Sequence, residues 1–230
     1  LQNIFPPGTT DADVAASGIG RFVSAGTPFY STASHIFRYF KGQEPLNTFY
    51  GANGTSALTR AASSLPGPYV LVQMSQGFWE SQGRLGLDRY PVRDADDPSL
   101  AADPHDPAIR AERAPRWFSA RSLISAEAEK KYLCEPLPAP AAALVHHVRS
   151  GKDTKTPVEL LWHKPKKPIE TFDPDHDKLP FTSVLGAGDN TVPRWGAALA
   201  STPDQRIYNC ASAKDHPTLL EHDEVLKAVL

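Results

Sequence analysis

Five short runs of β-forming residues, separated by stretches long enough for helices, constrain the fold of this 230-residue chain most strongly. Each run carries branched or aromatic apolar side chains and is too short for a typical helix. The runs are Gly20–Gly26, Tyr69–Met74, Ala143–Val148, Val158–Trp162 and Arg206–Asn209. Strands spaced in this way are typical of a parallel sheet joined by crossover connections. The sequence therefore predicts an α/β fold.

Four further segments have helical character, either through apolar residues on one face or through a content of strong helix formers. They are Ser34–Phe40, Thr55–Ser64, Ser122–Tyr132 and Leu219–Leu230. The segment Tyr90–Pro115 differs, because it is rich in Asp, Pro and Ala and has little apolar periodicity. We expect this segment to form an irregular connection or the surface of a cap.

The charge balance of the chain excludes several classes of function. The chain has 24 Lys and Arg residues against 26 Asp and Glu residues, a formal net charge of -2. Because phosphate-backbone binding needs a basic surface, we expect no nucleic-acid partner. No apolar run reaches the roughly 18 to 20 residues that span a bilayer. The sequence therefore predicts a soluble protein, with a cytoplasmic location favoured.

The possible ligand residues give no pattern that predicts a metal or cofactor. Cys134 and Cys210 are too few for a disulfide framework or a structural zinc. His146 and His147 point to opposite faces of a strand and so cannot bind one metal ion together. The acidic run at 172–177 alternates Asp as a calcium loop does, but it lacks the required glycine and the closing glutamate. We expect no metal and no cofactor.

Two residues in the last third of the chain have the chemistry of a catalytic acid and base. Asp189 lies in the motif GAGDNTVP (186–193), where glycines and a proline fix a tight loop. His216 follows the last predicted strand in the motif KDHPTLL (214–220). A rigidly held carboxylate can orient an imidazole, which then takes a proton from a nucleophile. We therefore predict that Asp189 and His216 are catalytic; the alternative is a turn aspartate beside a surface histidine.

Together with GTPFYS (26–31), these motifs resemble those of α/β-hydrolases of the lipase and acyltransferase type, close to the lecithin:cholesterol acyltransferase group. The resemblance implies the C-terminal part of an α/β-hydrolase parallel sheet with a loop-rich cap or lid insertion. Residues 1–29 would form a core strand and loop. Residues 30–140 would form the cap or lid, with a possible core strand near 69–74. Residues 141–230 would form the core that carries the acid and base loops.

The resemblance also bears on the nucleophile, because α/β-hydrolases carry Ser, then Asp or Glu, then His along the chain. If the strand at Gly20–Gly26 follows the nucleophile helix, the serine lies about 10 to 25 residues upstream of Leu1. Ser75 is the candidate within the chain, because it follows an apolar run and Gly77 comes two residues later. However, Gln73 is large where the strained elbow needs a small residue.

The resemblance implies a serine-type ester or lipid hydrolase or acyltransferase that works through an acyl-enzyme. Asp189 would take the acid position and His216 the base position, while Asn190 stands where the family usually has Gly. The expected partner is an ester or lipid substrate, with transient contact between the cap and a membrane or lipid surface. Two alternatives stay open: a non-catalytic binding module derived from a hydrolase, and a self-contained hydrolase that uses Ser75.

Overall fold

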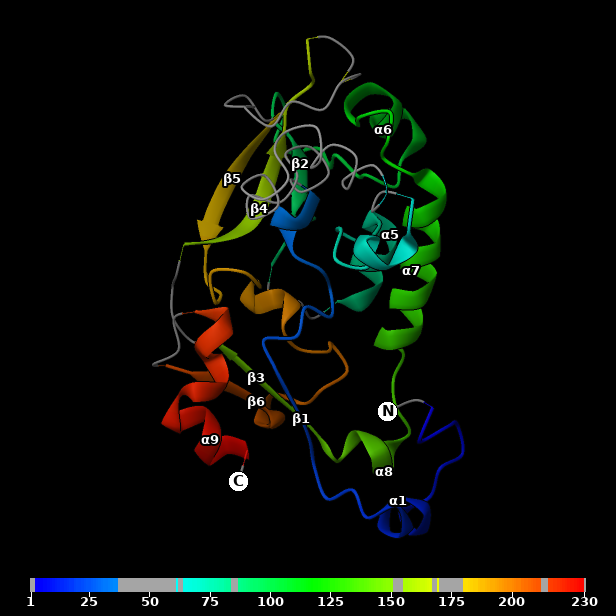
Figure 1. The fold of residues 1–230 in the computed structure, drawn as a ribbon, viewed down its shortest axis with the longest axis vertical. Helices are drawn as coiled ribbons and strands as arrows, with labels where there is room; N and C mark the ends of the chain where they lie inside the picture. The colour runs from blue at the N-terminus through cyan, green and yellow to red at the C-terminus, as the bar shows by residue number, and fades with distance from the viewer. Residues whose placement is uncertain are drawn as a thin grey trace.

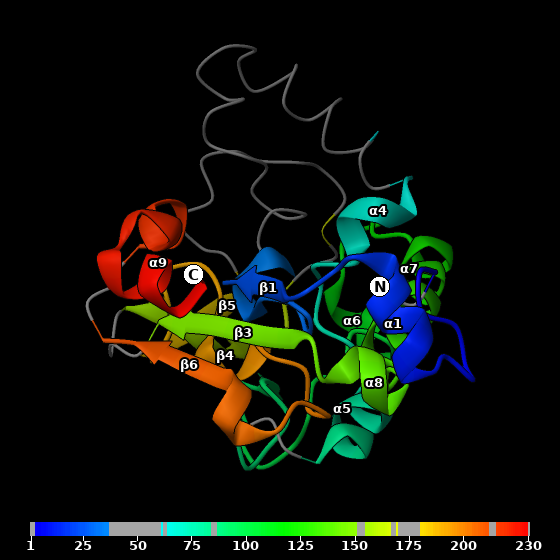
Figure 2. The same ribbon diagram turned by 90° about the horizontal axis from the view of Figure 1, so that it is seen from below.

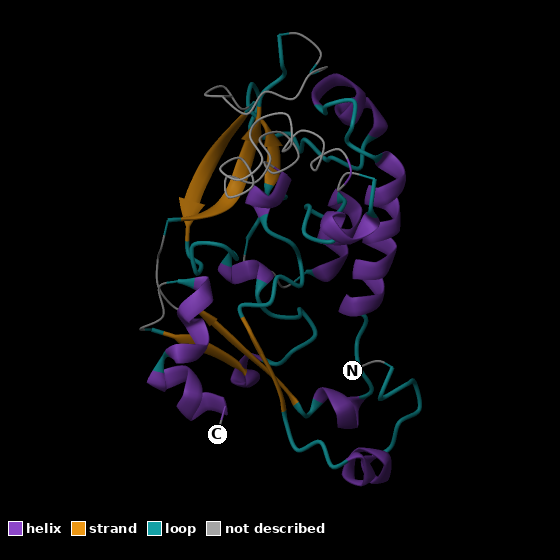
Figure 3. Ribbon diagram, viewed as in Figure 1, coloured by secondary structure: helices purple, strands orange, loops and turns teal. Residues whose placement is uncertain are grey.

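The structure is a computed structural model, which describes residues 3–36, 61, 64–83, 87–150, 155–166, 169, 180–211 and 215–229. These residues form two three-stranded sheets with helices packed around them (Figure 1 and Figure 3). The mixed α/β content agrees with the sequence prediction. The strands of the two sheets are interleaved along the chain, with β1, β3 and β6 in sheet A and β2, β4 and β5 in sheet B.

Sheet A is entirely parallel and has the strand order β1-β3-β6. Its strands are β1 Phe22–Ala25, β3 Val145–Ser150 and β6 Ile207–Cys210. All three overlap runs that were predicted to be strands, so these predictions are confirmed. Figure 2 shows the strands side by side, with α8 (Ala139–Ala142) near the end where β3 begins and α9 (Asp223–Val229) near the end where β3 finishes. The C-terminal ends of all three strands therefore lie towards α9.

The two faces of sheet A are covered by different parts of the chain, as is usual for parallel sheets. On one face, Val148 packs with Leu219 and Val225, which come from the segments after β6. Successive residues of a strand point to opposite faces, so Val145 and His147 lie on the other face. Both of these side chains are buried.

Sheet B is mixed, because β2 is parallel to β4 while β4 is antiparallel to β5. Its strands are β2 Val92–Asp94, β4 Thr156–Trp162 and β5 Phe181–Gly186. β4 confirms the strand predicted at Val158–Trp162. The β4–β5 register shifts after Pro157, a residue that has no N–H to give to the ladder. Arg93 of β2 forms a buried ion pair with Glu159 of β4, with an N–O distance of 2.7 Å.

The remaining elements are short, apart from one long helix. They are α1 Asp11–Ser17, η1 Ala33–Ile36, α4 Pro66–Tyr69, α5 Gln76–Gln82, α6 Pro107–Arg113, α7 Ala120–Cys134, η2 Arg194–Gly196, η3 Asp204–Arg206 and η4 His216–Glu221. The helix predicted at Ser122–Tyr132 is confirmed within α7, which begins where the Ser119 hydroxyl accepts a bond from the Ser122 amide.

The other predicted helices have different outcomes. The terminal helix predicted from Leu219 divides into η4 and α9, which begins at Asp223. At Ser34–Phe40 the structure forms the short η1 to Ile36, and residues 37–40 lie outside the described residues. Most of Thr55–Ser64 also lies outside them.

The strand predicted at Tyr69–Met74 is wrong. Pro66 begins the one-turn helix α4, which ends at Tyr69, and turn and irregular backbone follow to Met74. Proline fits the first turn of a helix because its missing N–H would have no partner there. Tyr69 and Met74 are each about 1% exposed, so the run is buried as expected. A short apolar run predicts burial more reliably than it predicts the backbone conformation.

The expectation of irregular structure at Tyr90–Pro115 is also partly wrong, because this segment contains both β2 and α6. The Asp106 side chain accepts a bond from the Ala108 amide at the start of α6, and Pro107 occupies its first turn. β2 has only three residues and exists through its pairing with β4. Three residues are too few to show the alternation of apolar and polar side chains by which a strand is predicted from sequence.

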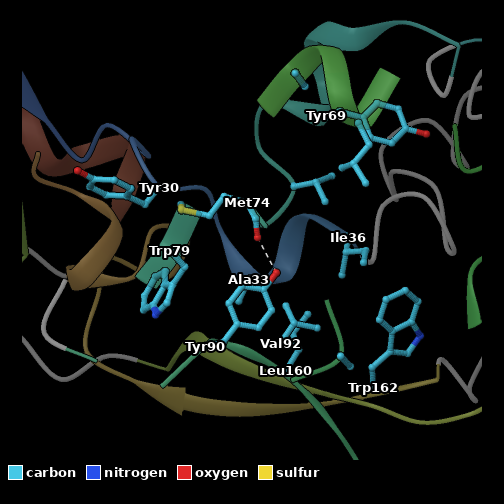
Figure 4. Close-up of a cluster of buried hydrophobic side chains, with 14 of the residues drawn as sticks. Tyr30, Ala33, Ile36, Tyr69, Met74, Trp79, Tyr90, Val92, Leu160 and Trp162 are labelled. Atoms are coloured by element: carbon cyan, nitrogen blue, oxygen red, sulfur yellow. Dashed lines mark hydrogen bonds between the residues drawn. The ribbon is translucent and has the colours of Figure 1, made fainter. Parts of the chain in front are cut away.

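The larger hydrophobic core joins sheet B to the surrounding helices. Figure 4 shows aromatic rings from several segments around Met74, whose carbonyl accepts a 2.5 Å hydrogen bond from the Tyr90 hydroxyl. Trp79 packs edge-on against Trp195, with 5.0 Å between ring centroids. Trp162 of β4 is fully buried in the same cluster. Residues from the range predicted as a cap therefore share one core with residues from the range predicted as the hydrolase core.

Candidate active site

The Asp189 carboxylate is held inside the loop that follows β5. Gly188 and Pro193 form an isolated β-bridge that closes this loop. One carboxylate oxygen, Oδ1, accepts hydrogen bonds from the backbone amides of Thr191 and Val192, at 3.1 and 2.6 Å. The residue is only 2% exposed. The GAGDNTVP motif thus folds into a turn that fixes a buried carboxylate, as the sequence predicted.

Two positions of this loop restrict which residue can occupy them, one because a side chain does not fit and one because the backbone is left-handed. A Cβ atom on Gly188 would lie 2.5 Å from the Val192 carbonyl oxygen and 2.6 Å from the Thr156 Oγ1, so a side chain does not fit. Asn190 has a φ of +67°, in the left-handed region that Asn tolerates better than most residues. Its amide donates to Thr156 Oγ1 at 2.8 Å. The left-handed backbone explains why Asn is acceptable where the resembled family usually has Gly.

His216 begins η4 and contacts Asp189 through both its backbone and its ring. Its backbone amide donates to the Asp189 carbonyl at 2.8 Å. Its ring atom Nδ1 lies 2.8 Å from Asp189 Oδ2. The imidazole is 35% exposed, whereas the carboxylate is buried. The structure therefore brings together the two residues that the sequence predicted as acid and base.

The contact between Asp189 and His216 assigns the tautomer of the ring. A carboxylate only accepts hydrogen bonds, so Nδ1 carries the proton and Nε2 carries a free lone pair. Within the described ranges, no residue hydrogen-bonds to His216 Nε2. An imidazole oriented in this way can accept a proton at Nε2 and remain stabilised by the carboxylate behind it.

Gly26, at the C-terminal end of β1, lies directly against this pair. A Cβ atom here would be 2.8 Å from Asp189 Oδ2 and 2.9 Å from His216 Nδ1. Gly26 also has a φ of +60°, which favours glycine. The sequence analysis did not select Gly26 as a site residue, although the GTPFYS motif begins with it. The end of β1 is thereby placed beside the acid and base.

A second connection between the acid and base loops was also missed. The Asn190 side-chain amide donates a hydrogen bond to the carboxylate of Asp215, the residue before His216. This bond joins two loops that are 25 positions apart in the chain. It limits how far the segment that carries His216 can move from Asp189.

Ser75, the alternative nucleophile, belongs to a different cluster. It caps the start of α5, where its hydroxyl accepts from the Phe78 amide and donates to Glu127 Oε1 at 2.7 Å. His105 contacts the same carboxylate at 2.9 Å through Nδ1, so Glu127 lies between the serine and the histidine. In Figure 1, α5 and α9 lie on opposite sides of the molecule. Ser75 is thus not brought together with Asp189 and His216.

The Glu127 carboxylate is suited to accept the hydrogen bond from Ser75. Burial would raise its pKa, but hydrogen bonds from His105, Lys131 and Ser75 hold the pKa well below its usual range. The carboxylate therefore stays ionised and accepts the Ser75 proton in its hydrogen bond. Because its pKa is so low, this carboxylate is a weak base for the Ser75 hydroxyl.

The remaining candidates form no metal site among the described residues, where no group of three or more His, Cys, Asp or Glu is placed to hold an ion. Burial lowers the pKa of His147 to about 4, and its two ring nitrogens contact Ser24 Oγ at 2.5 Å and Thr202 Oγ1 at 2.9 Å. His146 lies on the opposite face, as predicted. The acidic run at 172–177 lies outside the described residues.

Comparison with known proteins gives no family for this chain. No model of a protein family matches the sequence, and no curated protein is similar to it. Among the helices of the described ranges, none has the length and apolar character needed to cross a bilayer. Any statement of function therefore rests on the geometry of the site.

We predict that Gly26→Ala displaces the Asp189–His216 pair. The new methyl group would overlap both side chains, and overpacking of this kind costs about 1–3 kcal/mol. Gly18→Ala is the matched control, because Gly18 has a φ of +70° with no atom within 4 Å of the added Cβ. Denaturant unfolding should show a larger loss for Gly26→Ala than for Gly18→Ala. Equal losses would mean that backbone strain alone, rather than contact with the pair, is responsible.

We also predict that Asn190→Gly loosens His216 without straining the loop. Glycine keeps the left-handed backbone but removes the side-chain bond to Asp215. A hydrogen bond worth about 0.5–1.5 kcal/mol corresponds to a roughly two- to tenfold increase in the open population. Solvent exchange of the His216 Nδ1 proton, measured by NMR, should accelerate by that factor. An unchanged exchange rate would show that the Asn190–Asp215 bond does not position the ring.

Proposed function

We propose that this chain supplies the acid and base of a serine-type ester or lipid hydrolase or acyltransferase. The observation that carries the proposal is the 2.8 Å contact between the buried Asp189 carboxylate and Nδ1 of the partly exposed His216 ring. It leaves Nε2 as a base on the accessible side of the ring. Partial exposure of the ring makes this nitrogen accessible to a substrate or to a serine from another segment.

The mechanism follows from the roles of the two side chains. His216 Nε2 takes the proton of a serine hydroxyl as the oxygen attacks the ester carbonyl, and the ring becomes an imidazolium. Asp189 does not take up this proton; its carboxylate stabilises the charged ring and keeps it oriented. The imidazolium then protonates the leaving alcohol as the acyl-enzyme forms. Attack by water or by an alcohol acceptor repeats the same proton transfers and releases the acyl group.

The position of β1 supports a serine upstream of Leu1. β1 is an edge strand of the described part of sheet A, and its C-terminal end at Gly26 touches the Asp–His pair. Neighbouring strands lie about 4.8 Å apart, and parallel strands end at the same edge of a sheet. A serine at the end of a strand added in parallel to β1 would therefore lie beside Gly26, within reach of His216. Of the described residues, no serine occupies this position.

Ester turnover by the protein of native length tests this proposal. Asp189→Asn and His216→Ala should each lower kcat by at least about 10³-fold, the order expected when a member of such a triad is removed. His163→Ala is the control, because that exposed histidine contacts Thr182 on sheet B. Its kcat should be unchanged.

The kinetics also separate the proposal from its alternatives. No ester turnover by the native-length protein would favour a binding module that has lost catalysis. Turnover that survives both Asp189→Asn and His216→Ala, but is lost in Ser75→Ala, would show that the Ser75 cluster carries the activity. Either result would remove the proposed role of the Asp189–His216 pair.

A further inference from the structure

An apolar groove lies between sheet A and helix α7, and we refer to it as the β1–α7 groove. Its cavity volume is about 330 Å³, within the size range of cavities that hold small molecules. The apolar side chains that line it include Phe22, Phe29, Leu133, Val145 and Leu199. Phe22 and Leu133 remain 40% and 50% exposed, so the groove is open to solvent at these two side chains. A small apolar molecule can therefore enter it from outside.

One of the residues that line the groove, Lys130 of α7, brings an amino group to this apolar surface. Lys130 is only 2% exposed. Buried lysines are rare, and those that carry a charge are normally paired with a carboxylate. In the described part of the chain, Lys130 forms no ion pair. The groove therefore contains a buried amine that no carboxylate neutralises.

The hydrogen bonds of Lys130 match a neutral amine. Its Nζ atom donates to two acceptors, the Ser31 Oγ and the Val72 carbonyl oxygen. An ammonium has three N–H donors, whereas a neutral amine has two donors and a lone pair. Among the described residues, no third acceptor hydrogen-bonds to Nζ. The two acceptors thus satisfy the neutral form completely and leave its lone pair unused.

Burial favours the same neutral form, because it lowers the pKa of Lys130 to about 7. The charges of Glu127 and Cys134 on α7 would act in the opposite direction. However, Glu127 directs its carboxylate to Ser75 and His105, and burial raises the pKa of the Cys134 thiol to about 11, so that the thiol is uncharged. An ordinary lysine, with a pKa of about 10.4, is uncharged in well under 1% of molecules at pH 7. Lys130 is therefore far richer in free amine than an exposed lysine.

The other titratable side chains around the amine are uncharged near neutral pH. Of the described residues that line the groove, Lys130 and His147 alone are titratable. Burial lowers the pKa of His147 to about 4, so its ring is neutral. Burial also raises the pKa of Tyr30, which interacts with Cys134, well above its usual value. The groove therefore suits an uncharged ligand better than an anion or a cation.

Ser31 holds the Lys130 amino group in place. Ser31 is fully buried, and its hydroxyl donates to the Val72 carbonyl at 2.6 Å while it accepts from Nζ. Its φ of +82° is rare for a residue other than glycine. Such backbone strain persists only where the surrounding structure fixes it, and it is frequent at functional sites. The hydroxyl is also a group through which a proton can move to or from the nitrogen.

We propose that the β1–α7 groove binds an apolar aldehyde, which forms an imine with the amino group of Lys130. A desolvated lysine amine is the nucleophile that such chemistry requires. The Nζ lone pair attacks the carbonyl carbon to form a C–N bond, and a proton passes from the nitrogen to the carbonyl oxygen through the Ser31 hydroxyl. The C–O bond then breaks, a C=N bond forms, and one water molecule leaves. Aldehyde and amine thus give imine and water, with no oxidant or reductant.

This site is separate from the proposed acid and base. Neither Asp189 nor His216 lines the groove. The hydrocarbon chain of the aldehyde packs against the apolar lining, while the carbonyl carbon meets Nζ of Lys130. Binding of the aldehyde and ester turnover are therefore independent properties of the protein.

Reductive trapping in the protein of native length tests this proposal. The protein is incubated with octanal and sodium cyanoborohydride, which reduces an imine to a stable secondary amine, and peptide mapping locates the octyl group. At pH 7, Lys130 should be labelled at least about tenfold faster than Lys131, its neighbour on α7, whose side chain is 52% exposed. Labelling of Lys130 should fall as the pH is lowered below about 6, because its amine becomes protonated.

Two variants and a second aldehyde serve as matched controls. Lys130→Met keeps an unbranched apolar side chain and should lose the octyl group on this peptide, whereas Lys131→Met should keep it on Lys130. Acetaldehyde lacks the chain that fills the groove, so it should show a smaller preference for Lys130 than octanal does. Peptide mapping of the unsubstituted protein gives the result even where Lys130→Met does not fold.

Three results would overturn the proposal. They are the absence of an octyl group on Lys130, equal labelling of Lys130 and Lys131, and an equal preference for Lys130 with acetaldehyde and with octanal. The His216→Ala variant separates this inference from the proposed function, because it should lose ester turnover and keep the octyl group on Lys130. Turnover that depends on His216, without labelling of Lys130, would remove the aldehyde site and leave the catalytic pair.

Discussion

The hydrogen bond between the buried Asp189 carboxylate and the His216 ring is the interaction on which the functional account depends. It needs a carboxylate held by backbone amides, a glycine at position 26 that leaves room for both side chains, and a histidine brought back over the sheet edge. Each requirement is met by a different segment of the chain. Gly26 and His216 follow strands β1 and β6 of sheet A, whereas Asp189 follows β5 of sheet B, so the site forms only where the two sheets are brought together.

The sequence predicted the parts of the molecule that local chemistry controls. Asp189 and His216 were found because glycines, prolines and strand ends mark rigid loops, and the structure brings the two residues together. The strands of sheet A and β4 were found because their runs are apolar and bounded by turn residues. In these places, local propensity and tertiary packing favour the same structure.

The rest depends on contacts that a single sequence does not display. The run at Tyr69–Met74 is buried as predicted, but its backbone conformation was missed, because the helical turn that begins at Pro66 ends at Tyr69 and irregular backbone follows. β2 was missed because its three residues become a strand only through pairing with β4. Gly26 and the Asn190–Asp215 bond were missed because their partners are distant in the chain. The Ser75 cluster was unforeseen for the same reason, since Glu127 comes from α7.

The most direct measurement is the reaction of the native-length protein with a fluorophosphonate probe, followed by identification of the modified residue by peptide mapping. The account predicts one labelled serine upstream of Leu1, at the end of a β-rich run, and loss of that label in the His216→Ala variant. Label on Ser75, or on no serine at all, would contradict it.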